Sequence, residues 1–169
     1  YDFDCFSIDP LSSNLLRQVK KVFGIFILPR VQTSEQITFL TKNGIEVTFV
    51  YHSYKLLQKP IYTDSISLFN LDDLAANKAY VIGRRGVWRD YVDLFFFLKW
   101  KLYSIDRINR LAREKFQGEF NEKLFLEQLV YFDDVKIVPI EFIKESYKEK
   151  EIKSFLEKQV EEYIRKRIP

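Results

Sequence analysis

The stretch from Leu71 to Lys101, LDDLAANKAYVIGRRGVWRDYVDLFFFLKWK, most strongly constrains the fold of this chain. Apolar residues recur at helical spacing in both of its halves, and the sequence GRRG separates them. We expect a helix that begins after Asn70 as its N-cap and ends at Gly83, and a second helix that is buried on most sides. Asp73 follows the cap by three residues and is expected to complete a capping-box-like arrangement.

The same stretch concentrates charged side chains, namely Lys78, Arg84, Arg85, Arg89, Asp90 and Asp93. Burying Asp90 and Asp93 without partners would cost roughly 1–3 kcal/mol each, so both should face cations, backbone donors or a ligand. Two interpretations stay open from the residues alone. The charges form an internal salt bridge between two helices, or they form a phosphate-binding surface with Lys78 as a point charge and Arg85 or Arg89 as a forked donor.

The opening segment YDFDCFS alternates large apolar residues with acids, and this period of two predicts a strand from Tyr1 to Ser7. Asp2 and Asp4 then share one face of the strand. Two such carboxylates can bind Mg²⁺ together with the phosphate oxygens of a substrate. A solvated strand face has the same pattern, so the pair alone does not decide between the two.

A helix is expected over residues 11–23, capped by Ser12 or Ser13, and Gly24 should end it. A short apolar strand is expected to follow, interrupted at Pro29 because proline lacks a backbone donor.

An Asn-Gly turn between β-rich runs predicts a hairpin of residues 36–41 and 45–51. Glu46, Thr48 and Val50 should share one face of its second strand. Helices are expected after residue 104, and the order of strands first and helices second indicates an α+β protein. Those helices should cover residues 105–116, 122–131 and 149–167, with Ser104 and Asn121 as caps for the first two.

Composition excludes several classes of protein. The net charge is only +3, so a polyanion site would have to be local. The chain has a single cysteine, no apolar run of the ~20 residues that span a bilayer and no signal-peptide pattern, so we expect a cytoplasmic protein without a membrane partner. His52 is the single histidine, which argues against histidine-based zinc sites and Ser-His nucleophiles. The absence of methionine suggests a fragment of a longer protein.

The segment AANKAYVIGRRGVWRDYVDLFFFLK resembles the AAMKLxAIxxRGxxxDFxDLYFLL segment of the AbiEii/AbiGii toxin family of nucleotidyltransferases. LEQLVYFDDVKIVPIEFI is similar to a second segment of that family, LxSLxYFDDAExxPxPxxL. The resemblance covers nearly the whole chain. Six residues fall at the family's mutual spacing without a gap: Lys78, Arg85, Gly86, Asp90, Asp93 and Leu94.

By this resemblance, Asp2 and Asp4 are the paired metal-binding aspartates of the active-site strand. Lys78 engages the nucleotide phosphates, and Asp93 belongs with these three in the catalytic set. Many polymerase-like transferases carry a third metal-binding carboxylate on a neighbouring strand, and Glu46 is the candidate for that role here.

Arg85, Arg89 and Asp90 are expected to complete the nucleotide-binding side with Lys78. The fold implied is a small mixed or antiparallel nucleotidyltransferase sheet with a flanking helix, followed by a C-terminal helical bundle. Residues 1–68 would form a partial nucleotidyltransferase core, and residues 69–169 a helical region that completes the cleft in one compact unit.

The resemblance implies a toxin of a bacterial toxin-antitoxin or abortive-infection system. It would transfer a nucleotide from an NTP to an acceptor, RNA or tRNA in particular, with Mg²⁺, and would have an antitoxin protein as partner. The chain begins after the family's GGTALAxxxGHRxSxD segment, so we expect the full-length parent to be the enzyme and this chain alone to be inactive. Two alternatives stay open: a non-catalytic module that binds nucleotide, RNA or antitoxin, and a nucleotidyltransferase that modifies a protein.

Overall fold

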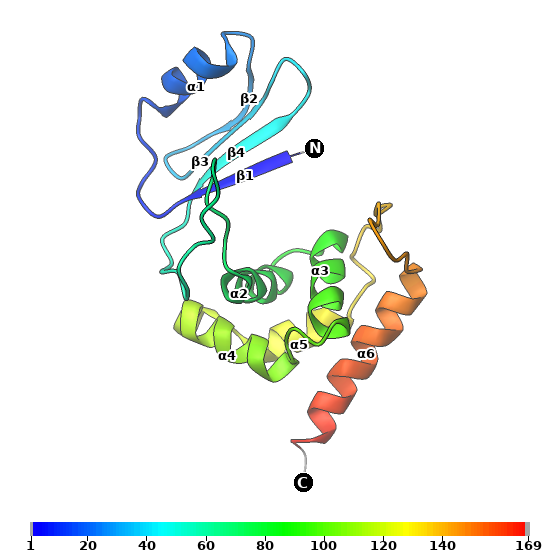
Figure 1. Ribbon diagram of the computed structural model, residues 1–169. Coiled ribbons are helices and arrows are strands. Elements are labelled where there is room, and N and C mark those ends of the chain that lie inside the picture. The colour runs from blue at the N-terminus through cyan, green and yellow to red at the C-terminus, as the bar shows by residue number, and fades with distance from the viewer. Residues whose placement is uncertain (1, 168–169) are drawn as a thin grey trace. The chain divides into compact units, whose positions relative to one another are not determined.

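The computed structural model describes residues 2–167, which form two compact units that meet in sequence between Lys55 and Leu56. The first unit holds a four-stranded sheet with one helix, and the second holds five helices (Figure 1). The expected α+β class, a small mixed sheet followed by helices, is confirmed. Tyr1, which was expected to open the first strand, lies outside the described residues.

The sheet has the strand order β1-β4-β3-β2. Its strands are β1 (Asp2–Ser7), β2 (Leu28–Gln32), β3 (Gln36–Leu40) and β4 (Glu46–Tyr51). β1 runs parallel to β4, whereas β3 is antiparallel to both of its neighbours. The predicted hairpin is therefore confirmed, and Gly44 in its turn has a φ of 77°, which glycine adopts without strain.

Helix α1 (Leu15–Phe23) covers one face of the sheet and ends at Gly24, as expected. Buried side chains join the two elements in a small core: Val19, Ile27, Ile37, Phe39 and Val47. The predicted start at residue 11 is wrong, as are the predicted caps. The Ser12 hydroxyl accepts a hydrogen bond from the backbone N–H of Asn14, so it stabilises a turn ahead of the helix instead of capping it.

Pro29 does not interrupt a strand as expected but lies inside β2. β2 is an edge strand, and a missing N–H is tolerated where no neighbouring strand needs it. The pairing with β3 shifts in register between Pro29 and Val31, which adapts the ladder to the proline.

The second unit contains α2 (Leu71–Ile82), α3 (Trp88–Lys99), α4 (Ile105–Phe116), α5 (Glu122–Val130) and α6 (Glu149–Arg165), with a short 3₁₀ helix at Gln117–Glu119. Three predicted N-caps are confirmed, because the side chains of Asn70, Ser104 and Asn121 each accept a hydrogen bond from a backbone N–H in the first turn. Among the helices of residues 2–167, none has both the length and the apolar character that crossing a bilayer requires.

Asp73 does not act in a capping box, because its carboxylate is fully buried and has other partners. It accepts hydrogen bonds from the backbone N–H groups of Leu57 and Gln58 and lies 2.6 Å from the Lys115 ammonium. These bonds attach the segment after Leu56 to the helices. The two compact units divide between Lys55 and Leu56. The domain boundary after residue 68 stays a prediction.

Tyr91 joins α3 to the end of α5. Its side chain is buried, and its hydroxyl donates to the carbonyl oxygens of Gln128 and Tyr131 at 3.0 and 3.1 Å. Burial, followed by the negative charges of Asp134 and Asp90, raises the pKa of the Tyr91 phenol to about 12. The folded protein therefore favours the neutral phenol.

We expect Tyr91→Phe to lower the free energy of unfolding by about 1–2 kcal/mol at neutral pH, because two carbonyl oxygens lose their donor. A raised pKa contributes stability that is complete below the ordinary tyrosine pKa of about 10 and is lost as the pH rises through about 12. The parent should therefore lose more stability than Tyr91→Phe above about pH 10. Urea unfolding followed by tryptophan fluorescence measures both effects, with the exposed Tyr62→Phe as control.

Candidate functional site

One group of candidate residues lies on a face of the sheet, within the first unit. The parallel register places Asp2 opposite Glu46 and Asp4 opposite Thr48. Residues opposite each other on adjacent strands point to the same side, so these four share one face. That face is opposite to the one that carries Val47 and packs against α1. The predicted grouping of Asp2, Asp4 and Glu46 on one side of the sheet is thus what the register produces.

The donor set on this face has two carboxylates on β1 and one on β4. Among residues 2–167, no group of three or more His, Cys, Asp or Glu side chains is arranged to hold a metal ion. Mg²⁺ needs only one or two protein carboxylates when water and substrate phosphate supply its other oxygens, so Asp2 and Asp4 fit the protein's share. Glu46 as a third ligand stays a prediction. Thr48, next to Asp4, forms a buried hydroxyl–hydroxyl hydrogen bond of 3.1 Å with Thr38.

A separate group of candidate residues, within the helical unit, is an ion cluster between α2 and α3. The Lys78 ammonium lies 2.7 Å from Asp90 Oδ1 and 2.6 Å from Asp93 Oδ2, and Arg85 lies 3.4 Å from Asp90 Oδ2. Asp90 and Asp93 are three residues apart on α3, so both reach the same lysine. The salt bridge between the two helices, one of the two interpretations from sequence, is present. Phosphate binding by the same group stays a prediction.

Exposure differs sharply within this cluster. The side chain of Asp90 is 3% exposed, that of Lys78 20% and that of Asp93 46%. Burial lowers the pKa of the Lys78 ammonium, but the charge of Asp93 and hydrogen bonds to both aspartates outweigh it, so the pKa is raised overall. Lys78 is therefore a cation at neutral pH. A phosphate would meet this cation from the Asp93 side, because Asp90 is enclosed.

The three arginines near the cluster have different surroundings. Arg85 is exposed and is oriented by Asp90, and Arg89 lies on the exposed side of the first turn of α3. Arg84 instead lies over the Tyr80 ring, 3.5 Å from its centroid, and donates to the backbone carbonyl of Glu119. Arg84 thus has a structural role, whereas the other two are placed to meet solvent.

The connection between α2 and α3 packs against residues 134–136. The sequence pattern did not predict this contact. A Cβ atom on Gly86 would lie 3.3 Å from Asp134 Oδ1 and 3.3 Å from Val135 Cγ2, so glycine permits this approach. Val87 also forms a parallel bridge with Lys136. The partners are far apart in the sequence. The only feature of the sequence that links the two segments is that both resemble segments of the same family.

No protein-family model matches the chain. It is 29% identical over 167 residues to the uncharacterized protein aq_aa25 of Aquifex aeolicus (strain VF5), covering 97% of this chain and 78% of that protein. A crystal structure of a "putative nucleotidyltransferase" from H. pylori superposes with a TM-score of 0.52 at 18% identity, covering 98% of this chain and 77% of that one. The chain has a nucleotidyltransferase-like fold. JHP933 from Helicobacter pylori, at 16% identity and 99% and 80% coverage, has a TM-score of 0.41, too low to support an argument.

Proposed function

We propose that the protein is a nucleotidyltransferase that moves a nucleotide from an NTP to an acceptor. The observation that carries the proposal is the placement of Asp2 and Asp4 on one sheet face of a nucleotidyltransferase-like fold. The cluster at Lys78 supports it, because it supplies an oriented, partly exposed cation.

In this reaction an acceptor hydroxyl oxygen forms a bond to the α-phosphorus, and the bond from that phosphorus to the bridging oxygen breaks. Pyrophosphate leaves, and the proton of the acceptor hydroxyl passes to water. Asp2 and Asp4, with Glu46 as a further candidate, would hold Mg²⁺. When bound, Mg²⁺ supplies positive charge that offsets the charge of the triphosphate. Lys78 stabilises the negative charge that builds on the pyrophosphate, and Asp93 keeps the ammonium oriented.

The solvent exposure of the other charged side chains indicates which of them can contact the nucleotide. Arg85 and Arg89 reach solvent beside the cluster and are suited to phosphate oxygens, since a guanidinium donates to two oxygens at once. Asp90 is too enclosed to touch a nucleotide and acts by holding Lys78 and Arg85. It is a positioning residue.

The finer assignment also belongs to the proposal. The spacing of Lys78, Arg85, Asp90 and Asp93 supports membership of the AbiEii/AbiGii toxin family. With it come a role as toxin in an abortive-infection system, a cytoplasmic location, an RNA or tRNA acceptor and an antitoxin partner. Labelled NTPs incubated with the product of the complete reading frame, Mg²⁺ and bulk RNA test transfer. Label that enters protein instead of RNA would assign a protein-modifying transferase.

A second candidate is a module that binds nucleotide, RNA or an antitoxin without catalysing nucleotide transfer. It is favoured by one observation: Lys78 already has two carboxylate partners within 2.7 Å. A structural ion pair needs nothing more, whereas a phosphate would have to compete with Asp93.

Lys78→Ala tests whether Lys78 contacts the nucleotide or forms only a structural ion pair. If Lys78 meets phosphate, NTP affinity should fall by about tenfold or more, because a charged hydrogen bond is lost. The variant should also lose roughly 2–3 kcal/mol of stability, since Asp90 remains buried without its lysine. Calorimetric titration with ATP, GTP, CTP and UTP measures affinity, and urea unfolding measures stability. The exposed Lys158→Ala is the matched control.

Asp93→Asn is expected to change NTP affinity in the opposite direction to Lys78→Ala. Removing the exposed carboxylate frees one side of Lys78, so NTP binding should tighten severalfold if phosphate competes with Asp93. Nucleotide affinity that neither substitution changes would contradict the proposed contact and support the purely structural ion pair.

A further inference from the structure

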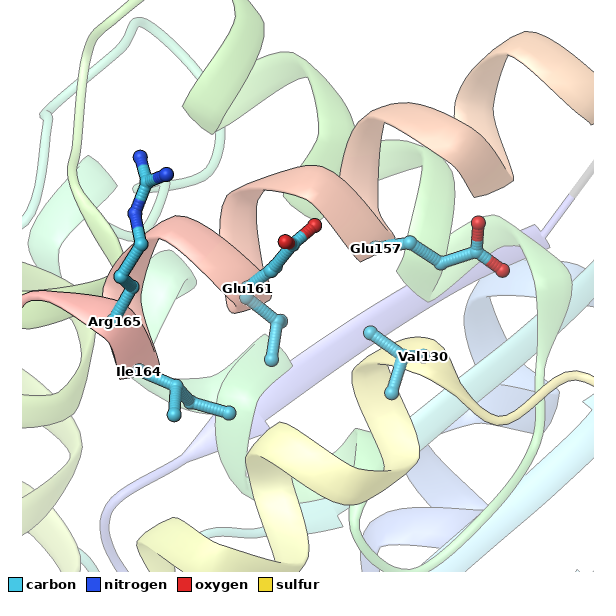
Figure 2. A pocket seen from close by; sticks show the side chains of 6 residues that line it. Val130, Glu157, Glu161, Ile164 and Arg165 are labelled. Carbon is cyan, nitrogen blue, oxygen red and sulfur yellow. The ribbon is translucent and has the colours of Figure 1, made fainter. Parts of the chain in front are cut away.

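An apolar groove runs between α5 and α6. Two adjoining cavities of about 760 and 540 Å³ form it and share three lining residues. Its apolar residues come from both helices and are Leu126, Val130, Val160 and Ile164. Figure 2 shows Val130 on α5 and Ile164 on α6 directed into the space between the two helices.

The apolar side chains of α6 extend from the buried core of the helical unit to the groove. Ile152, Leu156, Val160 and Tyr163 on this helix are buried. Ile164 remains 41% exposed, although it follows Val160 at the spacing of one helical turn. Exposed apolar surface lined by two helices and edged by charge is typical of a binding groove.

The edge of the groove carries an excess of acids. Glu157 and Glu161 on α6 are exposed, and Figure 2 shows both beside the space. They are four residues apart, a spacing at which like charges repel on a helix. Within residues 2–167 no ion pair is formed by either, whereas Lys153 and Lys158 on the same helix pair with other glutamates. An incoming cation would relieve this repulsion.

Two further acids, Glu122 and Glu127, line the α5 side together with Lys123, and Arg165 lines the α6 side. Glu122 pairs with Arg113, and Glu127 is 3.7 Å from Lys123, so the charges of both α5 acids are offset. Glu157 and Glu161 against Arg165 leave the α6 side acidic, which disfavours a nucleic acid there and favours a basic ligand.

We propose that this groove binds a basic amphipathic helix of a protein partner. The apolar stripe of that helix fills the surface at Leu126, Val130 and Ile164, and its Lys or Arg side chains pair with Glu157 and Glu161. A helix fits better than an extended peptide because it satisfies its own backbone hydrogen bonds, and the floor of this groove is apolar. This inference is independent of the proposed catalytic function.

The test uses the full chain and two fluorescein-labelled helical peptides. Both carry Leu at positions i, i+3, i+4 and i+7; one has Lys at the flanking positions and the other has Glu. Fluorescence anisotropy should show that the Lys peptide binds more tightly, by about tenfold or more, and that added salt weakens it. The double variant Glu157→Lys/Glu161→Lys should reverse this preference. Glu114→Lys, which changes an exposed acid of α4 outside the groove, should not.

A second substitution tests the apolar floor. Ile164→Asp should weaken the Lys peptide by about tenfold, because a carboxylate would replace apolar contact. Circular dichroism of each variant establishes that α6 remains folded. The inference is overturned if the two peptides bind equally well or if neither binds. It is also overturned if the affinity of the Lys peptide is unchanged in Glu157→Lys/Glu161→Lys. Sedimentation that shows a dimer dissociated by Ile164→Asp would also overturn it, since a second copy would then occupy the groove.

Discussion

Replacing Asp2 or Asp4 with asparagine is expected to slow nucleotide transfer by roughly 10³-fold, equivalent to about 4 kcal/mol of transition-state stabilisation. Asparagine keeps the size of the side chain and removes the charge that binds Mg²⁺. Asp2 and Asp4 are both exposed, so neither substitution disturbs the core of the sheet unit. Initial rates with labelled NTP, measured on the product of the complete reading frame, give the ratio of the parent rate to the variant rate.

Asp9→Asn is the matched control, because Asp9 is an exposed acid just beyond β1 and not on the shared face. It should retain the parent rate. Thermal unfolding should be unchanged in all three variants. A rate that survives both Asp2→Asn and Asp4→Asn would remove the metal role from this strand, and the Lys78 experiments would then decide whether nucleotide binds without transfer.

Lys115→Met is expected to have the largest effect on stability, about 3–5 kcal/mol, because it leaves Asp73 as a buried charge without its cation. Both side chains are fully buried, at 0% exposure, and their charged atoms are 2.6 Å apart. Burial lowers the pKa of the Lys115 ammonium, although Asp73 opposes that shift. Both tryptophans, Trp88 and Trp100, lie in the helical unit, so urea unfolding followed by tryptophan fluorescence reports on this unit.

Adding Asp73→Asn should restore part of that loss. Asparagine removes the buried charge and keeps an oxygen for the backbone N–H groups of Leu57 and Gln58. Lys158→Met is the matched control on an exposed lysine and should change stability by less than about 0.5 kcal/mol. Lys115→Met within about 1 kcal/mol of the parent would show that the buried pair contributes little beyond an apolar pair.

Local patterns predicted the elements that depend on neighbours in sequence. Asn70, Ser104 and Asn121 cap helices because each side chain reaches a backbone N–H two or three residues ahead. The Asn-Gly turn produced the hairpin because Gly44 adopts a positive φ there, which is also a local property. Ser12 has an equally good cap pattern but forms a turn. A local rule cannot choose between two local hydrogen bonds of similar strength.

Contacts between distant residues were not predictable in the same way. The partners of Asp73 are fifteen or more residues away, and nothing in the local pattern distinguishes it from a capping residue. The approach of Asp134 to Gly86 is of the same kind. Pro29 is tolerated only because β2 is an edge strand, which is a property of the whole sheet.

The sequence by itself determined the α+β class, most helix boundaries and the strand face shared by Asp2 and Asp4, because periodicity and turn chemistry act over a few residues. That Glu46 lies on the same side of the sheet depends on the pairing of β1 with β4, which only the tertiary structure decided. Only the tertiary structure decided that Lys78 meets Asp90 and Asp93 together, because that pairing depends on how α2 and α3 pack. It likewise decided that α5 and α6 leave a groove between them. A groove is the space that packing leaves unfilled, and no residue pattern specifies it.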